Sequence, residues 1–195
     1  MDTLLIFIKN PVKGKVKTRI AQTAGEERAL QIYFELLRHT REVALRTTAR
    51  RLLFYSDFID ENDEWSSRDF QKMVQHGSDL GERMNNAFRL GLVHPDDRAV
   101  IIGSDCAALS HEIVATAFAQ LENHPFVIGP ATDGGYYLLG MRQHTPELFS
   151  DIAWSTEAVL PATLQRINDL GATCYMLPEL SDVDFETDWE REGWL

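Results

Sequence analysis

Short apolar runs alternate with amphipathic stretches along most of this sequence, and this alternation constrains the fold more than any other feature. Six runs have the length and composition of β-strands: Leu4–Ile8, Leu52–Tyr55, Ala99–Gly103, Pro125–Ile128, Tyr136–Met141 and Thr173–Leu177. Four stretches space their apolar residues as helices do: Glu26–Leu45, Leu80–Leu92, His111–Leu121 and Thr156–Leu170. Alternating strands and helices are typical of α/β proteins, so we predict an α/β fold.

Residues at the helix ends refine this prediction. Ser110 is expected to cap the helix that begins at His111. Pro161 either begins the helix Thr156–Leu170 or kinks it. In the helix Leu80–Leu92, one stripe is expected to face the core: Leu80, Met84, Ala87, Phe88 and Gly91. The most polar connection, Ser56–Arg68, is expected to be a mobile loop.

The size and charge of the chain restrict its class. With 195 residues, of which 44% are hydrophobic and 25% charged, we expect a single domain over residues 1–195. No apolar run approaches the roughly 20 residues needed to cross a bilayer, and no signal peptide is evident, so we expect a cytoplasmic protein with reduced cysteines. The net charge of -11 argues against binding to nucleic acid or to an anionic membrane surface.

A cationic loop follows the first apolar strand. Five basic side chains lie between Phe7 and Ile20, at positions Lys9, Lys13, Lys15, Lys17 and Arg19. A strand, a bent loop with Pro11 and Gly14, and a helix N-terminus would direct backbone N–H groups and cations at one point, which suits a phosphate. The alternative is a solvated basic loop, but the cations alternate with other residues and the rest of the chain is acidic, so we favour phosphate binding.

The C-terminal segment has the opposite charge. Seven acidic side chains accompany one Arg between Glu179 and Leu195: Glu179, Asp182, Asp184, Glu186, Asp188, Glu190 and Glu192. If folding brings Asp182 and Asp184 to the basic loop, a hard divalent cation could lie between these carboxylates and a polyphosphate. An acidic segment can equally be a solvated face, which is the interpretation we favour from Glu186 onward.

Two further aspartates follow predicted strands. Asp105 follows Ser104 just after the run that ends at Gly103, at the strand end where open α/β sheets bind ligands. Its position alone is equally compatible with a metal ligand and with a turn cap. Asp133 precedes Gly134 and Gly135, a pattern that is typical of a hairpin turn but that also lets a ligand approach the backbone closely.

Several common site motifs are missing. The spacing of a P-loop fails because Lys9 stands where its first Gly is needed and Val16 follows Gly14-Lys15. The first strand-to-helix turn has no dinucleotide-binding glycine fingerprint. The six histidines have no paired ligand spacing, and no serine lies in a nucleophile elbow.

Taken together, the segments resemble a family of bacterial glycosyltransferase-A-fold proteins, described as glycosyltransferase-like or nucleotide-diphospho-sugar transferase-like. The matching segments are Phe7–Pro11 with Gly14 and Lys17–Arg19, Asp79–Met84, Gly103–Cys106, Gly129–Ala131 with Asp133–Tyr136, Trp154–Thr156, and Asp182–Asp184. The resemblance implies one three-layer α/β/α sandwich, with a mixed, mainly parallel sheet that binds a nucleoside di- or triphosphate. Two positions depart from the family pattern: Ala107 stands where Pro is expected, and Phe185 where Thr is usual.

The resemblance also implies a reaction and roles for the site residues. It implies a metal-dependent transferase with a nucleotide-sugar or nucleoside triphosphate donor, glycosyl transfer being favoured, and with an unidentified small-molecule acceptor. The alternatives are nucleotidyl transfer to a phosphorylated small molecule, and a nucleotide-binding module without turnover. Lys9, Lys17, Arg19 and Ser104 are assigned to nucleotide binding. Asp105 with Asp182 or Asp184 would hold Mg²⁺ or Mn²⁺, and Asp133 would act on the acceptor as a base.

Overall fold

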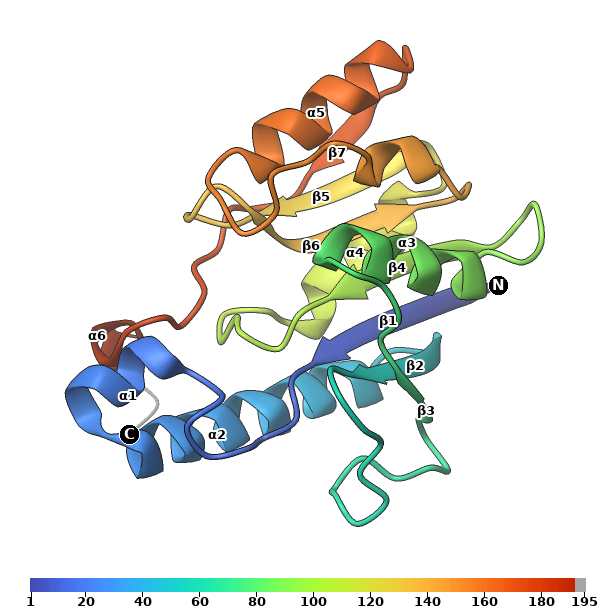
Figure 1. The fold of residues 1–195 in the computed structure, drawn as a ribbon. Coiled ribbons are helices and arrows are strands. Elements are labelled where there is room, and N and C mark those ends of the chain that lie inside the picture. Colours follow the sequence, from blue (N-terminus) through green and yellow to red (C-terminus); the bar gives the residue numbers. More distant parts are fainter. Residues whose placement is uncertain (192–195) are drawn as a thin grey trace.

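The computed structural model describes residues 1–191, which form seven strands, six α-helices and one short 3-10 helix (Figure 1). The strands are β1 (Asp2–Ile8), β2 (Arg50–Tyr55), β3 (Gln71–Val74), β4 (Arg98–Ile102), β5 (Phe126–Pro130), β6 (Tyr136–Met141) and β7 (Cys174–Met176). The helices are α1 (Thr18–Ala24), α2 (Glu26–Leu45), α3 (Leu80–Gly91), α4 (His111–Gln120), η1 (Pro146–Phe149), α5 (Val159–Asp169) and α6 (Glu186–Arg191). Glu192, one of the acidic residues noted in the sequence, lies outside the described residues.

The strands form one mixed sheet. Their order is β3-β2-β1-β4-β6-β5-β7, and β6 is antiparallel to both of its neighbours while the other pairs are parallel. Strands β1 and β4 are adjacent, so the segments that leave them start at the same edge of the sheet. The topology confirms the predicted α/β sandwich with a mainly parallel sheet.

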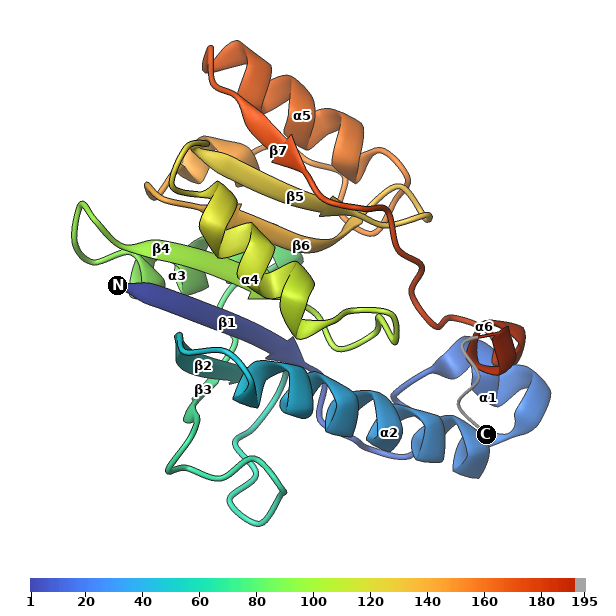
Figure 2. The same ribbon diagram turned by 180° about the vertical axis from the view of Figure 1, so that it is seen from behind.

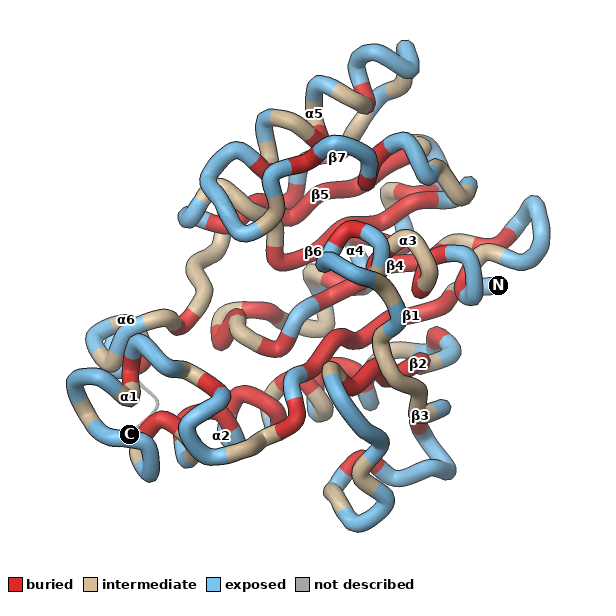
Figure 3. The backbone as a smooth tube through the Cα atoms, viewed as in Figure 1, coloured by how far each residue is buried: buried red, intermediate tan, exposed pale blue. Residues whose placement is uncertain are grey.

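Two layers of helices cover the sheet. Seen from behind in Figure 2, α2 and α4 lie across one face, whereas α3 and α5 cover the face seen in Figure 1. The side chains of β1 alternate between these layers, because Leu4 and Ile6 join the core beneath α2 and α4 while Leu5 and Phe7 join the core beneath α3 and α5. The central strands are therefore buried along most of their length (Figure 3).

The helix ends follow the sequence closely. The Ser110 hydroxyl accepts a hydrogen bond from the Ile113 N–H at 3.4 Å, as expected of a cap. Pro161 lies in the first turn of α5, so it begins this helix and does not kink it. Leu80 differs from expectation, because its position in the first turn of α3 leaves it 41% exposed at the rim of a cavity and not in the core.

The loop between β2 and β3 is fastened at two points. Near its start, the buried Asn10 side chain accepts from the Asp57 N–H at 3.0 Å and donates to the Phe58 carbonyl at 2.9 Å. Further along, Asp63 accepts from the Lys72 ammonium at 2.7 Å. Sequence polarity alone favoured a mobile loop, whereas these contacts link the loop to the start of the basic segment.

None of the helices within residues 1–191 is both long and apolar enough to cross a membrane.

Candidate nucleotide site

A cavity of about 640 Å³ lies at the carboxyl end of β1 and β4. Its walls come from the basic loop and α1, the residues after β4, the β5–β6 turn, the segment before α5, and the segment between β7 and α6. Seven of the eight predicted site residues line it: Lys9, Lys17, Arg19, Asp105, Asp133, Asp182 and Asp184. A second cavity, of about 880 Å³, lies at the opposite ends of the strands and is lined by none of the eight.

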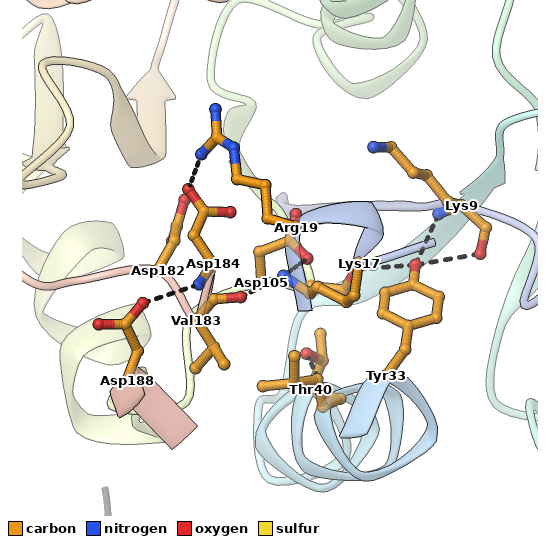
Figure 4. A network of polar contacts seen from close by, with 12 residues as sticks. Lys9, Lys17, Arg19, Tyr33, Thr40, Asp105, Asp182, Val183, Asp184 and Asp188 are labelled. Atoms are coloured by element: carbon orange, nitrogen blue, oxygen red, sulfur yellow. Dashed lines mark hydrogen bonds and ion pairs between the residues drawn. The ribbon is translucent and has the colours of Figure 1, made fainter. Parts of the chain in front are cut away.

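Lys17 connects three segments that are distant in sequence. Its ammonium lies 2.5 Å from Asp105 Oδ1 and donates a hydrogen bond to the Val183 carbonyl at 2.8 Å (Figure 4). The Val183 N–H in turn donates to the Asp105 carbonyl at 2.8 Å. The Lys17 side chain is only 5% exposed, and its backbone has a left-handed conformation with φ 46° just before α1. Lys17 therefore holds the basic loop, the end of β4 and the C-terminal segment in one arrangement.

Arg19 makes a second connection between the basic loop and the C-terminal segment. Its guanidinium lies 2.5 Å from Asp184 Oδ2 and 5.9 Å from the centre of the Phe185 ring. Asp188 then accepts from the N–H groups of Asp184 and Phe185, at 3.1 and 2.8 Å. This carboxylate reaches back from the first turn of α6 to the N–H groups before the helix, whereas a Thr hydroxyl at position 185 would have accepted from an N–H within that turn.

Asp182 lies between like charges in a site that is partly closed to water. Burial, and next the charge of Asp105, raise the pKa of the Asp182 carboxyl to about 7, and Lys17 offsets only part of this effect. Asp133 and Asp184 add smaller contributions in the same direction as Asp105. The nearby positive charge is therefore too small to keep the Asp182 carboxyl fully ionised at neutral pH.

Lys9 and Ser104 are arranged around a buried tyrosine. The Tyr33 hydroxyl accepts from the Lys9 N–H at 2.8 Å and donates to the Lys9 carbonyl at 3.0 Å, and Ser104 Oγ lies 3.2 Å away. Burial raises the pKa of the Tyr33 phenol, so the hydroxyl stays protonated. The Lys9 side chain is exposed and lines the cavity, and no partner of its ammonium is found among residues 1–191. Ser104 is 4% exposed and supports the cavity floor from beneath without lining it.

Asp133 lies in the turn between β5 and β6, whereas Lys9 follows β1, and β4 lies between β1 and β6 in the sheet. Its Oδ1 accepts from the Gly135 N–H at 2.9 Å, so it does stabilise the turn that the sequence pattern indicates. It is nevertheless exposed and lines the cavity, so it is both a turn residue and a residue that a ligand could contact.

Sequence reasoning missed much of the remaining lining. Leu80 and Met84 of α3, Tyr136 of β6, and the residues Trp154–Glu157 before α5 also face the cavity. The sequence pattern assigned Leu80 and Met84 to the core-facing stripe of their helix, and it placed Trp154–Thr156 among the family-like segments without giving them a role.

The carboxylates fit a particular kind of metal binding. Within residues 1–191, no group of three or more His, Cys, Asp or Glu side chains is arranged to hold a metal ion. Asp105 and Asp182 interact closely enough to raise the pKa of Asp182, and two carboxylates with phosphate oxygens are a common ligand set for Mg²⁺. The residues present therefore suit an ion that arrives with a phosphate ligand.

The α/β fold matches that of solved structures described as nucleotide-diphospho-sugar transferases. A crystal structure from Desulfovibrio desulfuricans G20, of a candidate nucleotide-diphospho-sugar transferase, matches with a TM-score of 0.87 at 31% sequence identity. That match covers 94% of this chain and 82% of the other. The chain belongs to the DUF2064 family, described as an uncharacterized protein conserved in bacteria, whose model matches residues 39–156. The resemblance inferred from the sequence motifs is confirmed.

More distant structures share the fold alone. A CMP:2-keto-3-deoxy-manno-octonic acid synthetase complexed with CTP matches with a TM-score of 0.56 at 10% identity, covering 97% of this chain and 95% of the other. A 4-diphosphocytidyl-2C-methyl-D-erythritol synthase from Anaerococcus prevotii DSM 20548 matches with a TM-score of 0.61 at 7% identity. That match covers 98% of this chain and 94% of the other. A search of curated proteins found no match.

The raised pKa of Asp182 predicts a pH-dependent stability. Between the ordinary Asp pKa of 3.8 and about 7, the folded protein binds more protons than the unfolded chain, so its stability falls as pH rises through this window. The Asp182→Asn protein lacks this loss and should be more stable than the parent at pH 8 by up to about 4 kcal/mol, with the gain vanishing below about pH 4.

Urea unfolding of both proteins between pH 4 and 8 measures this difference. The Asp96→Asn protein, altered at an exposed carboxylate at the far end of the sheet, should follow the parent at every pH. An Asp182→Asn protein that is less stable than the parent at pH 8 would contradict the interpretation.

Proposed function

We propose that this protein is a transferase that takes a nucleotide donor into the cavity over β1 and β4, with glycosyl transfer from a nucleotide-sugar as the favoured reaction. The observation that carries the proposal is the convergence of Lys9, Lys17 and Arg19 with the carboxylates of Asp105 and Asp182 at one strand edge. Cations and carboxylates together suit a metal-bound diphosphate, because the cations can meet the phosphate oxygens and the carboxylates can meet the metal ion. The cavity of about 640 Å³ is within the usual size for a small-molecule site.

The basic side chains divide into two roles under this proposal. Lys9 is exposed in the cavity and Arg19 is on its rim, so both can donate charge-assisted hydrogen bonds to phosphate oxygens. Lys17 is enclosed between Asp105 and Val183 and positions the loop. Ser104 acts indirectly, because it contacts Tyr33, which fixes the backbone of Lys9.

A divalent cation would bind to Asp105 together with Asp182 or Asp184. Its charge would stabilise the negative charge that develops on the leaving phosphate. In the protein alone, Asp105 is paired with Lys17 and Asp184 with Arg19. A metal–nucleotide complex offers the carboxylates a metal ion and Arg19 a phosphate, whereas a free metal ion or a free nucleotide satisfies only one of these, so metal and nucleotide should bind cooperatively.

The acceptor is placed on the opposite side of the cavity, beside Asp133. A carboxylate within reach of a hydroxyl nucleophile can take up its proton during transfer. Gly134 and Gly135 follow Asp133 and have no side chains, so an acceptor can come close to the backbone of the turn.

Nucleotidyl transfer is the second candidate. It is favoured by one observation, that solved structures with this fold include a CTP complex of a CMP-sugar synthetase and a 4-diphosphocytidyl-2C-methyl-D-erythritol synthase. In that reaction the acceptor is itself a phosphate and needs no general base.

Nucleotide binding should depend on Lys9 and Arg19. Each charge-assisted bond contributes roughly 1.5–3 kcal/mol, so Lys9→Ala and Arg19→Ala should each weaken binding about 10- to 100-fold. Calorimetry with nucleoside di- and triphosphates and nucleotide-sugars in Mg²⁺ measures the effect. Lys15→Ala is the matched control, because Lys15 is an exposed cation of the same loop outside the cavity lining. Equal affinities for all four proteins would contradict the phosphate assignment.

Asp133→Asn should separate binding from transfer. The amide is nearly isosteric and still accepts from Gly135, but it cannot take up the acceptor proton, so turnover should fall by a factor on the order of 100 to 10,000 at nearly unchanged donor affinity. Single-turnover rates with an established substrate pair measure this. Undiminished transfer by the folded variant would return Asp133 to the role of a turn residue, and a parent that binds nucleotides but turns over none would favour a binding module.

A further inference from the structure

The wall of the cavity that faces the cations has a different chemical character. Every Lys and Arg that lines the cavity within the described residues belongs to the segment 9–19. The facing wall is built by α3, the β5–β6 turn and residues 154–157, and it combines aromatic rings with two carboxylates: Tyr136, Trp154, Asp133 and Glu157. This half of the cavity therefore offers hydrogen-bond acceptors and apolar rings, but no positive charge from the described chain.

Trp154 is held in a fixed position on this wall. Its indole lies directly over Gly81 of α3, where an added Cβ would come within 2.3 Å of the Trp154 Nε1 atom. It also stacks with Phe149, with ring centres 6.4 Å apart and planes inclined by 26°, and it stays partly exposed where it lines the cavity. Gly81 thus makes room for an aromatic platform that needs little further ordering when a ligand binds.

The two carboxylates are set close to this platform by rigid backbone. Gly134 has φ +88°, and an added Cβ there would lie 2.6 Å from the Glu157 Cα atom, so the β5–β6 turn packs directly against the segment before α5. The Leu160 N–H donates to the Gly134 carbonyl at 2.9 Å and closes this contact. Asp133 and Glu157 are exposed on the two packed segments.

We propose that this wall is the acceptor subsite and that it binds a neutral, polyhydroxylated molecule, a sugar or a glycoside, and not a phosphorylated one. The inference rests on the proposed function and specifies its acceptor. A pyranose has a C–H face that packs on an indole and hydroxyl groups that donate to carboxylates. A phosphate placed here would meet Asp133 and Glu157 without a cation to balance it.

Saturation-transfer NMR tests the proposal with defined probes. The methyl glycosides of glucose, galactose, mannose and N-acetylglucosamine are compared with the corresponding sugar 6-phosphates, with and without nucleoside diphosphate and Mg²⁺. At least one neutral glycoside should receive saturation, and its binding should weaken about fivefold or more in Trp154→Ala, with part of the affinity restored in Trp154→Phe. Glu157→Gln changes an exposed side chain, so it should weaken binding of the same glycoside without disturbing the fold.

The controls separate the two halves of the cavity. Phe58→Ala removes an exposed aromatic ring outside the cavity and should leave glycoside binding unchanged. A sugar phosphate can also occupy the donor half, so only binding that depends on Trp154 counts for this wall. The proposal is overturned if no neutral glycoside binds, or if a sugar phosphate binds more tightly in a Trp154-dependent way. Saturation transfer to the nucleoside diphosphate in the same samples reports whether the nucleotide binds. A failure of the proposed nucleotide site would therefore be distinguished from a failure of the acceptor proposal.

Discussion

The contact between the Lys17 ammonium, the Asp105 carboxylate and the Val183 carbonyl is the interaction on which the site depends. It joins the basic loop, the end of β4 and the C-terminal segment. A left-handed conformation costs a residue with a side chain roughly 1–2 kcal/mol, and Lys17 adopts one immediately before α1. Its two polar contacts offset that cost and keep the ammonium in the one place where it partly balances Asp105 and Asp182.

The same contacts explain why the site suits a ligand that carries both signs of charge. Arg19 is paired with Asp184 just as Lys17 is with Asp105, so the site holds charges of both signs next to one another. Lys9 adds an exposed cation over the tyrosine that fixes its backbone. Within residues 1–191, the lining around Trp154 and Asp133 contributes no cation, and under the proposed function this asymmetry separates the donor subsite from the acceptor subsite.

The fold and the charged residues of the cavity could be predicted from the sequence because both follow from local patterns. Apolar runs revealed six strands, but β3 was missed since Gln71–Val74 has little apolar content and gains its place only by pairing with β2. The aspartates were found because they follow strands. The burial of Ser104, the enclosed position of Lys17 and the wall around Trp154 are set by contacts between distant segments, which local patterns do not encode.

The most direct test of this account is a calorimetric titration of nucleotides into the parent and the Asp105→Asn protein, each with and without Mg²⁺. The account predicts that Mg²⁺ strengthens nucleotide binding by about tenfold or more in the parent, a coupling of roughly 1.4 kcal/mol, and that this gain is lost in Asp105→Asn. The Asp96→Asn protein should keep the full effect of Mg²⁺. Equal nucleotide affinities in the parent and in Asp105→Asn under both conditions, or no nucleotide binding to the parent at all, would contradict it.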